Sequence, residues 1–179
     1  MSAIRERFPP QGLAGMIVHG PAWQTDRTRR WFLPCPTDPP TSSTWLSAAG
    51  HAGNRMQDTF LVTTHLTTML PVDFVSLNSV YPVCGAEGTG NMVWGIGVNL
   101  AADGEVYNTH SGTLGPYTDG MVQNVIEVMD DHDLTALFAA FDINDLIDMA
   151  FTREGNNVAD TINADVIFLG WLFSYEADM

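Results

Sequence analysis

The side chains that most often carry chemistry are scattered along this 179-residue chain. None of its histidines belongs to an HExxH zinc motif or to a pair at helical i, i+4 spacing, and no GxSxG nucleophile motif occurs. The chain has no lysine, which excludes a Walker A phosphate loop and a Schiff-base lysine. We therefore expect no catalytic residue, no cofactor and no bound metal. The histidines are His19, His51, His65, His110 and His132.

Two smaller groups of reactive residues have ordinary structural explanations. The run from Asp130 to Asp133, which includes His132, is the densest set of oxygen and nitrogen ligands. It could bind a divalent cation, but a solvated acidic loop explains it better. Cys35 and Cys84 lack the spacing of a zinc site or of a disulfide framework. A nucleophilic role for Cys84 has no local signature, so we expect two reduced, buried thiols.

Arg153 is the one charged residue that the sequence places beside the core. It continues the alternation of Ile147, Met149 and Phe151, so its guanidinium is expected at the rim of the core, where an unpaired charge would be costly. Asp160 follows the tight turn that begins at Glu154. We predict an Arg153–Asp160 ion pair that braces this hairpin and has a structural role.

The elements that must position these residues are predicted to be strands, because apolar residues alternate with a period of two from Thr59 onward. Glycine clusters and an Asp-Gly turn signal separate the strands, and no βα repeat occurs. This pattern predicts an all-β, antiparallel jelly-roll or β-sandwich of about eight strands with an irregular N-terminal arm. The expected elements are strands near 59–70, 75–83, 92–98, 105–109, 122–129, 147–151 and 166–175, a short helix within 134–141, and a long loop at 110–120.

Residues 1–57 are predicted to form an extended arm, and residues 58–179 the jelly-roll domain. The arm is rich in proline, arginine and aromatic residues, and residues 1–60 carry six arginines against four acids, whereas residues 61–179 carry one against seventeen. A body so acidic repels nucleic acid and anionic membranes. The aromatic arm is expected to be pinned onto a partner. Its predicted contact residues are Arg5, Arg7, Trp23, Arg27, Arg29, Arg30, Trp31, Phe32 and Trp45.

The last predicted strand carries apolar residues on both of its faces. In an antiparallel sandwich one face meets the core, so the other must be covered either by the arm or by a neighbouring subunit. We favour a neighbouring subunit. The predicted oligomer interface comprises Ile167, Leu169, Trp171, Phe173 and Tyr175.

Four segments of the predicted domain are similar to a known group of proteins. They are NMVWGIGV at 91–98, AFTREG at 150–155, ADTI at 159–162 and ADVIFLGW at 164–171, which runs on to Tyr175. Together they resemble jelly-roll domains of phage virion proteins, namely capsid decoration proteins and the head domains of fibres. The resemblance covers about residues 59–179. It implies a homotrimer on a virion and brings no catalytic residues.

These features favour a capsid decoration, or cement, protein on the exterior of the capsid. In this reading the domain trimerises, and the arm grips the major capsid protein or another virion protein through tryptophan and arginine anchors. A tail spike or receptor-binding knob is the first alternative, with the segment 110–120 as a host-contacting loop. A sugar-binding or cupin-type module is a weaker alternative, since scattered histidines do not suggest the metal site of a cupin.

Overall fold

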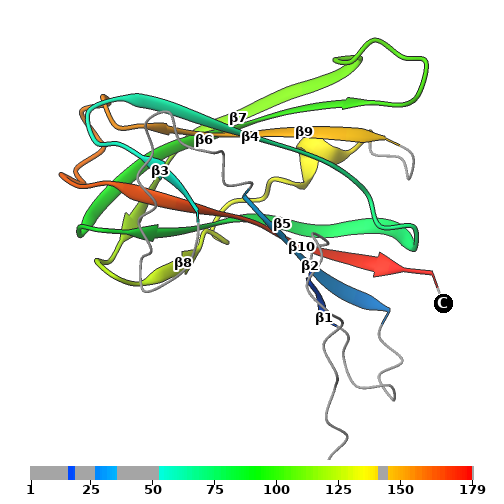
Figure 1. Cartoon of the computed structure of the whole chain (residues 1–179), viewed down its shortest axis with the longest axis horizontal. Coiled ribbons are helices and arrows are strands. Elements are labelled where there is room, and N and C mark those ends of the chain that lie inside the picture. The colour runs from blue at the N-terminus through cyan, green and yellow to red at the C-terminus, as the bar shows by residue number, and fades with distance from the viewer. Residues whose placement is uncertain (1–15, 19–26, 36–52, 141–144, 179) are drawn as a thin grey trace, which may run out of the picture.

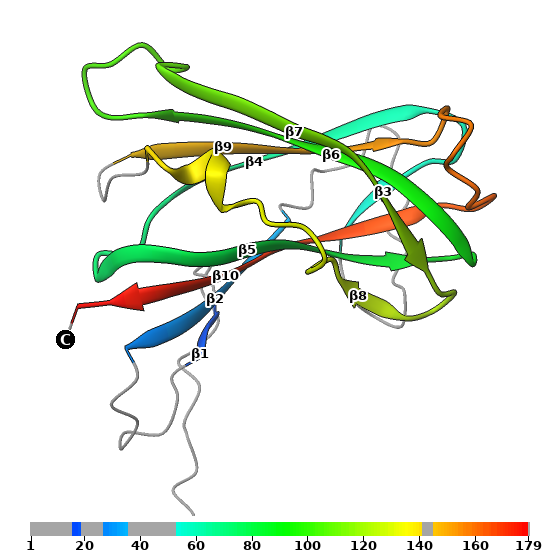
Figure 2. The same cartoon turned by 180° about the vertical axis from the view of Figure 1, so that it is seen from behind.

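The computed structural model describes residues 16–18, 27–35, 53–140 and 145–178. Two antiparallel sheets pack face to face as a sandwich (Figures 1 and 2). One sheet contains β1 (Met16–Val18), β2 (Thr28–Pro34), β3 (Asn54–Met56), β5 (Phe74–Ala86), β8 (Ile126–Val128) and β10 (Val166–Ala177). The other contains β4 (Leu61–Met69), β6 (Gly90–Ala101), β7 (His110–Met121) and β9 (Leu146–Glu154), and the 3-10 helix η1 spans Thr135–Phe138.

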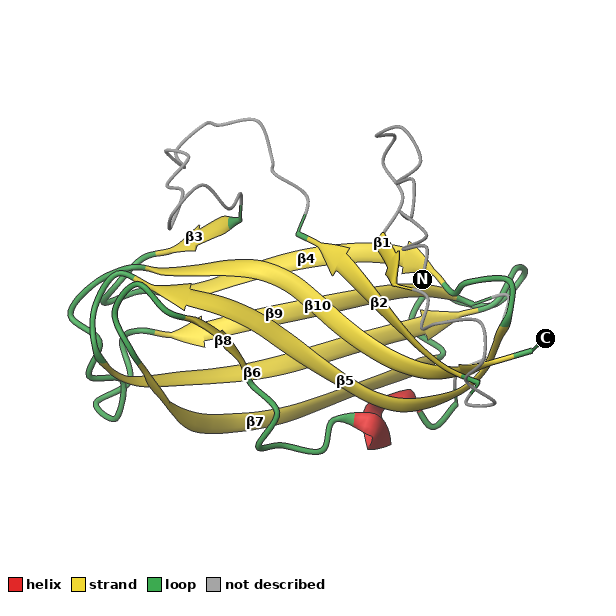
Figure 3. Ribbon diagram, turned by 90° about the horizontal axis from the view of Figure 1, so that it is seen from below, coloured by secondary structure: helices red, strands yellow, loops and turns green. Residues whose placement is uncertain are grey.

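The order of the strands is that of a jelly roll. The six-stranded sheet runs β1-β2-β10-β5-β8, with β3 also paired to β10, and the four-stranded sheet runs β4-β9-β6-β7. The chain crosses repeatedly between the sheets, so that strands distant in sequence become neighbours, as the view from below shows (Figure 3). The predicted all-β antiparallel sandwich is confirmed.

The core lies between the two sheets and is built from the inward positions of alternating strands. In β4 and β9 every second residue is buried or partly buried, as a strand with one wet face requires. Aromatic rings fill the centre: Phe151 stacks on Phe168 with ring centroids 4.6 Å apart, and Trp171 meets Phe168 edge-on at 5.5 Å. Trp94 stacks on the opposite side of this group, 5.5 Å from Phe151.

Strand β10 changes its inward-facing positions halfway along its length. Phe168 pairs with Cys84 but Gly170 pairs with the preceding Val83, so one extra residue forms a bulge. Before the bulge Phe168 faces the core, and after it Trp171 does. Gly170 has a φ of +144°, which strongly favours glycine, and a Cβ there would overlap the carbonyl oxygen of Leu33.

The boundary predicted at residue 57 is wrong. Thr28–Pro34, assigned to the arm, is β2, a full strand that pairs with β10 over seven residues, and Asn54–Met56 is β3, paired with the other half of β10. β2 is the first of the eight strands that make the jelly roll. The sandwich therefore includes part of the proline-rich region, and β1, which also lies in the predicted arm, pairs with β2.

Three further elements differ from the prediction. Residues 110–120, expected as a loop, form the edge strand β7, which pairs with β6. The expected strand at 105–109 is instead part of the turn between β6 and β7, and the strand expected at 122–129 shortens to β8. The short helix expected within 134–141 is present as the single 3-10 turn η1.

Replacing Gly170 by alanine should lower the free energy of unfolding by about 2 kcal/mol or more, because the new Cβ meets backbone atoms of β2 in a strained conformation. Urea denaturation measures the change. Gly120→Ala is the control, since a Cβ there has nothing within 4 Å, and it should change stability by less than about 0.5 kcal/mol. Equal effects of the two substitutions would contradict the role assigned to the bulge.

Candidate functional site

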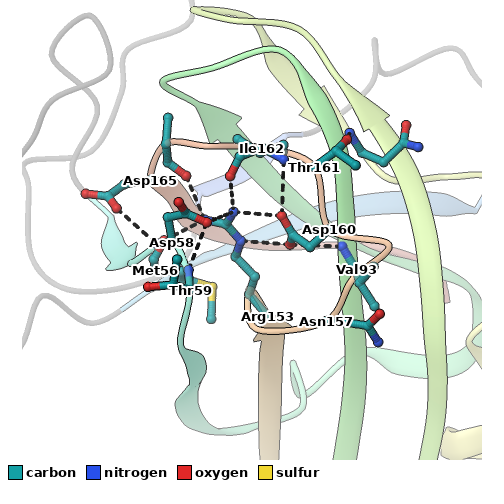
Figure 4. Close-up of polar contacts among 12 residues, drawn as sticks. Met56, Asp58, Thr59, Val93, Arg153, Asn157, Asp160, Thr161, Ile162 and Asp165 are labelled. Carbon is teal, nitrogen blue, oxygen red and sulfur yellow. Dashed lines mark hydrogen bonds and ion pairs between the residues drawn. The ribbon is translucent and has the colours of Figure 1, made fainter.

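The most highly connected polar group of the described residues is the Arg153 guanidinium, whose side chain is 0% exposed. Its Nε and Nη2 atoms each donate a hydrogen bond to a different carboxylate oxygen of Asp160, at 3.0 and 2.9 Å. The remaining bonds run to backbone carbonyls: Nη1 donates to Met56 at 3.0 Å and to Ala164 at 2.9 Å, and Nη2 donates to Ile162 at 2.9 Å (Figure 4). All five N–H donors of the guanidinium are thus used.

Asp160 is equally well satisfied. Besides Arg153, its carboxylate accepts hydrogen bonds from the backbone N–H groups of Val93 at 3.2 Å and Ile162 at 3.3 Å. Next to it, Thr161 and Asn91 exchange two bonds: the Thr161 N–H donates to the Asn91 carbonyl, and the Asn91 N–H donates to Thr161 Oγ1. This arrangement, hereafter the Arg153 centre, ties the loop between β9 and β10 to β6 and to β3 (Figure 4).

The predicted Arg153–Asp160 ion pair is confirmed, but its surroundings differ from the prediction. Arg153 lies wholly inside the protein and not at the rim of the core. A second arginine supports the same loop from outside, since Arg55 pairs with Asp165 and lies 3.7 Å from Glu87. Because no donor of Arg153 is left over, the centre can hold loops in place but has no hydrogen bond to offer a substrate.

The predicted arm contacts separate into two groups. Arg5, Arg7, Trp23 and Trp45 lie outside the described residues. The others belong to β2 or flank it: Arg29 pairs with Asp73, while Arg27 and Arg30 are exposed. The prediction that Trp31 contacts a partner is wrong, because Trp31 is buried between the sheets, with its ring centroid 5.2 Å from that of Phe173. Phe32 packs on the outer face of the sheet, against Ile167, Leu169 and Val83.

The predicted oligomer interface on β10 is also corrected. Trp171, Phe173 and Tyr175 are buried in the core between the sheets, because the bulge turns them inward. Ile167 and Leu169 do lie on the outer face, yet they too are buried within the chain. Gly53 lies over them: a Cβ at Gly53 would be 2.7 Å from Ile167 Cγ2 and 3.0 Å from Leu169 Cδ2.

The outer face of the six-stranded sheet nevertheless carries an apolar stripe that crosses four strands. Directly paired residues place their side chains on the same face, so the register defines the stripe. It is buried at its middle and exposed at β8, where Ile126 and Val128 are 43% and 39% exposed. The sequence prediction did not include this edge. The outer stripe consists of Ile126, Gly85 and Ile167, then Val128 and Val83, then Tyr81, Leu172 and Phe32.

The described histidines do not converge. Each lies beside a carboxylate of its own, in three separate parts of the molecule. The His132 ring also stacks on Tyr117 at 4.0 Å, and Asp119 accepts a 2.6 Å hydrogen bond from Trp94 Nε1. Among the described residues no three His, Cys, Asp or Glu side chains form a group suited to a metal ion. The pairs are His65–Asp148 at 3.2 Å, His110–Glu105 at 3.9 Å and His132–Asp119 at 3.0 Å.

A cavity of about 350 Å³ lies beside the acidic run and is lined by residues 78–81 and 130–135. Asp130 and Asp131 are exposed, and the exposed Asp133 carboxylate accepts hydrogen bonds from the N–H and hydroxyl groups of Thr135. These bonds lower the pKa of Asp133. The carboxylates therefore behave as the solvated acidic loop that the sequence favours.

Both cysteines are free and buried. Burial raises the pKa of the Cys35 thiol to about 11, although a hydrogen bond with Thr64 partly offsets this rise. Burial also raises the pKa of Cys84, which is 0% exposed. Thiols that stay protonated and out of contact with solvent are poor nucleophiles, so these residues serve packing.

The chain matches no family model, no curated protein and no solved structure.

In the part of the chain that the structure describes, no helix has the length and apolar character needed to cross a membrane.

Arg153→Met should lower the free energy of unfolding by about 3 to 5 kcal/mol, because it leaves a buried carboxylate and three carbonyl groups without their donor. Guanidinium denaturation followed by tryptophan fluorescence measures the loss. The exposed Arg30 provides a matched control: Arg30→Met removes the same charge and should cost less than about 1 kcal/mol. A loss below about 1 kcal/mol in Arg153→Met would show that the Arg153 centre does not support the fold.

The buried thiols predict a loss of stability at alkaline pH. Above the ordinary thiol pKa of 9.0 the unfolded chain releases protons that the native thiols retain. Their contribution to stability is therefore complete below pH 9.0 and is lost as the pH rises toward about 11. The free energy of unfolding, measured by denaturation at several pH values across this range, should fall less steeply with pH for Cys35→Ala than for the unmodified protein. An equal fall in both proteins would show that Cys35 does not retain its proton in the native state.

Proposed function

We propose that this protein is a non-catalytic structural subunit of a viral particle, a capsid decoration protein on the exterior of the shell. The observation that carries the proposal is the outer stripe, which gives one sheet of the sandwich apolar residues on both faces. A sheet of a free-standing sandwich needs only one such face, and an exposed apolar region is a common contact surface. The partner is the major capsid protein or another virion protein.

The residues behind the resemblance to phage jelly-roll proteins support this proposal, because they meet at one place in the fold. Asn91 and Val93 of β6, Arg153 of β9 and Asp160 of the following loop all belong to the Arg153 centre. These residues bury one arginine and hold a loop in place. Residues with that role stabilise the fold and carry out no chemical reaction, which agrees with a structural subunit.

Such a subunit acts by adding contact area. Each Val, Ile or Phe side chain buried at a contact contributes about 1.5 to 3 kcal/mol, so one copy binds weakly unless several side chains act together. Many copies on one shell would act collectively, because each contact holds its neighbours in place. The protein would then stabilise a particle against internal pressure without any chemical step.

One observation favours a receptor-binding knob as a second candidate. The turn between β6 and β7 projects from one end of the sandwich, at the upper right in Figure 1, and its Tyr107 is 80% exposed. Val106 beside it is exposed as well. Exposed aromatic rings at a loop tip are suited to stacking on a sugar or to inserting into a receptor. This turn replaces residues 110–120 as the host-contacting element of that reading.

Electron microscopy of particles from a virus that encodes this chain tests the proposal. With an antibody label, we expect many copies spread over the shell and a loss of shell stability when the gene is deleted. A few copies confined to the tail would favour the knob, and a label absent from particles would overturn both readings.

The same particles test the arm. A deletion that stops before Thr28 removes the three-residue edge strand β1 but keeps β2, whereas a deletion that extends to residue 40 also removes β2, which pairs with β10. The arm model predicts that the shorter deletion leaves a folded protein that no longer binds the shell.

A further inference from the structure

The strand β4 forms one long edge of the four-stranded sheet. Among the described strands it pairs only with β9, over nine residues and without a bulge (Figure 3). Its sequence, LVTTHLTTM, contains no proline, no glycine and no lysine, arginine or acid. Proteins usually protect an edge strand from pairing with another chain by such residues, by a bulge or by keeping the strand short. Because β4 has none of these protections, its outward backbone groups are suited to pairing with another strand.

The other sheet edges in the described ranges are protected. At the far edge of the same sheet, β7 contains Pro116 and Asp119, and its pairing with β6 is interrupted by a register shift between Trp94 and Ile96. In the six-stranded sheet, the strands with a single neighbour are β1, β3 and β8, and each has three residues. Of these edges, β4 is therefore the best suited to pairing.

The order of residues in β4 indicates which strand it pairs with. Read from either end, β4 presents a similar series of side chains around His65 at its centre. A second copy of β4 can therefore pair with it antiparallel, with His65 opposite its counterpart. Leu61 then lies opposite Met69 at both ends of the contact, and the threonines between them also lie opposite each other. Directly opposite residues share a face, so this register continues both faces of the sheet, whereas a one-residue slip would not.

Exposed apolar side chains lie at both ends of β4. Phe60 and Leu61 at its start are more than half exposed, and so are Met69 at its end and Leu146, which is paired with Met69 on β9. In the antiparallel register the start of one copy meets the end of the other, so these groups cover each other twice. A strand from an unrelated protein would have to present apolar residues at the same two positions, whereas a second copy does so by symmetry.

We propose that this protein forms a twofold dimer in which the β4 strands of two copies pair antiparallel about His65. The two four-stranded sheets then join into one sheet of eight strands. The inference goes beyond the proposed function, because the contact uses the other sheet from the outer stripe and leaves the stripe to a virion partner. The trimer implied by the resemblance would need two different edges to pair at each contact.

The charge of the chain makes the dimer sensitive to salt. Each copy carries a net charge of −14, so long-range repulsion opposes association until salt screens it, over roughly 10 Å at 0.1 M. Dimerisation should therefore strengthen as sodium chloride is added. Close to the contact, the acids that flank β4 in sequence or lie opposite it on β9 are each engaged within the chain. They are Asp58 with Thr59, Asp73 with Arg29, Asp148 with His65 and Thr67, and Glu154 with Asn157.

Cysteine cross-linking of the full chain tests both the contact and its register. Directly opposite residues of an antiparallel pair have Cα atoms about 4.5 to 5.5 Å apart, which suits a disulfide. His65→Cys should therefore give a disulfide-linked dimer on non-reducing electrophoresis after mild oxidation. Thr63→Cys, on the same exposed face, is the matched control, because its two copies would lie roughly 14 Å apart along the strands. The native Cys35 and Cys84 are buried and should not cross-link.

Sedimentation velocity measures the association without a cross-link. We expect a monomer–dimer equilibrium whose dimer fraction rises with sodium chloride concentration. His65→Asp should raise the dimer Kd about tenfold or more, because it places two carboxylates opposite each other on the axis. His110→Asp makes the same change of charge at an exposed position of β7, on the other edge of the sheet. Its Kd should stay within about twofold of that of the unmodified protein.

Circular dichroism establishes that each variant is folded, and Thr63→Asp replaces His65→Asp if that protein does not fold. A protein that stays monomeric or forms a trimer would overturn the inference. So would equal cross-linking at positions 63 and 65, or equal Kd values for the two histidine-to-aspartate variants. These results would leave the proposed function standing, whereas a dimer that is absent from viral particles would overturn the proposed function alone.

Discussion

Burial of the Arg153 guanidinium is the constraint on which one end of this sandwich depends. A cation removed from water must recover in the protein the hydrogen bonds and the countercharge it has lost. Here Asp160 supplies the countercharge, and three backbone carbonyls accept the remaining bonds. Those carbonyls come from β3 and from the loop before β10, so satisfying one side chain fixes the relative positions of segments about a hundred residues apart in sequence. The loop needs no helix or disulfide to keep its shape.

The outer stripe is governed by a different requirement. A jelly roll normally hides one face of each sheet, but here the bulge at Gly170 sends Trp171 inward while Ile167 and Leu169 remain outside. The backbone of Gly53 can approach these two side chains because it has no Cβ. The stripe is therefore buried at its middle and exposed at Ile126 and Val128 of β8. A surface of this kind, partly covered by its own chain, leaves only a limited apolar area exposed.

The sequence predicted the features that are encoded locally. Alternation identified β4, β5, β6, β9 and β10, and the position of Arg153 after three core residues indicated a buried partner. It missed β2 because Trp31 is the only fully buried residue in TRRWFLP, and the strand is recognisable only beside β10. It missed β7 because the glycines and the proline of HSGTLGPYTDGM look like a loop, although an edge strand tolerates them. The glycine within IFLGWLF was a visible sign of the bulge that reverses the faces of β10.

The place of β10 in the sheet has a consequence for how the protein is made. β10 pairs with β2 on one side and with β5 on the other, and β3 also pairs with it. During synthesis, the strands on both sides of it leave the ribosome before residues 166–177 do, so the sheet lacks this strand until β10 has been made. Completion of the six-stranded sheet then depends on pairing between β10 and strands far from it in sequence, and such long-range contacts form slowly. The nascent chain must hold open, uncovered strand edges until then, which is the situation in which chaperones are most useful.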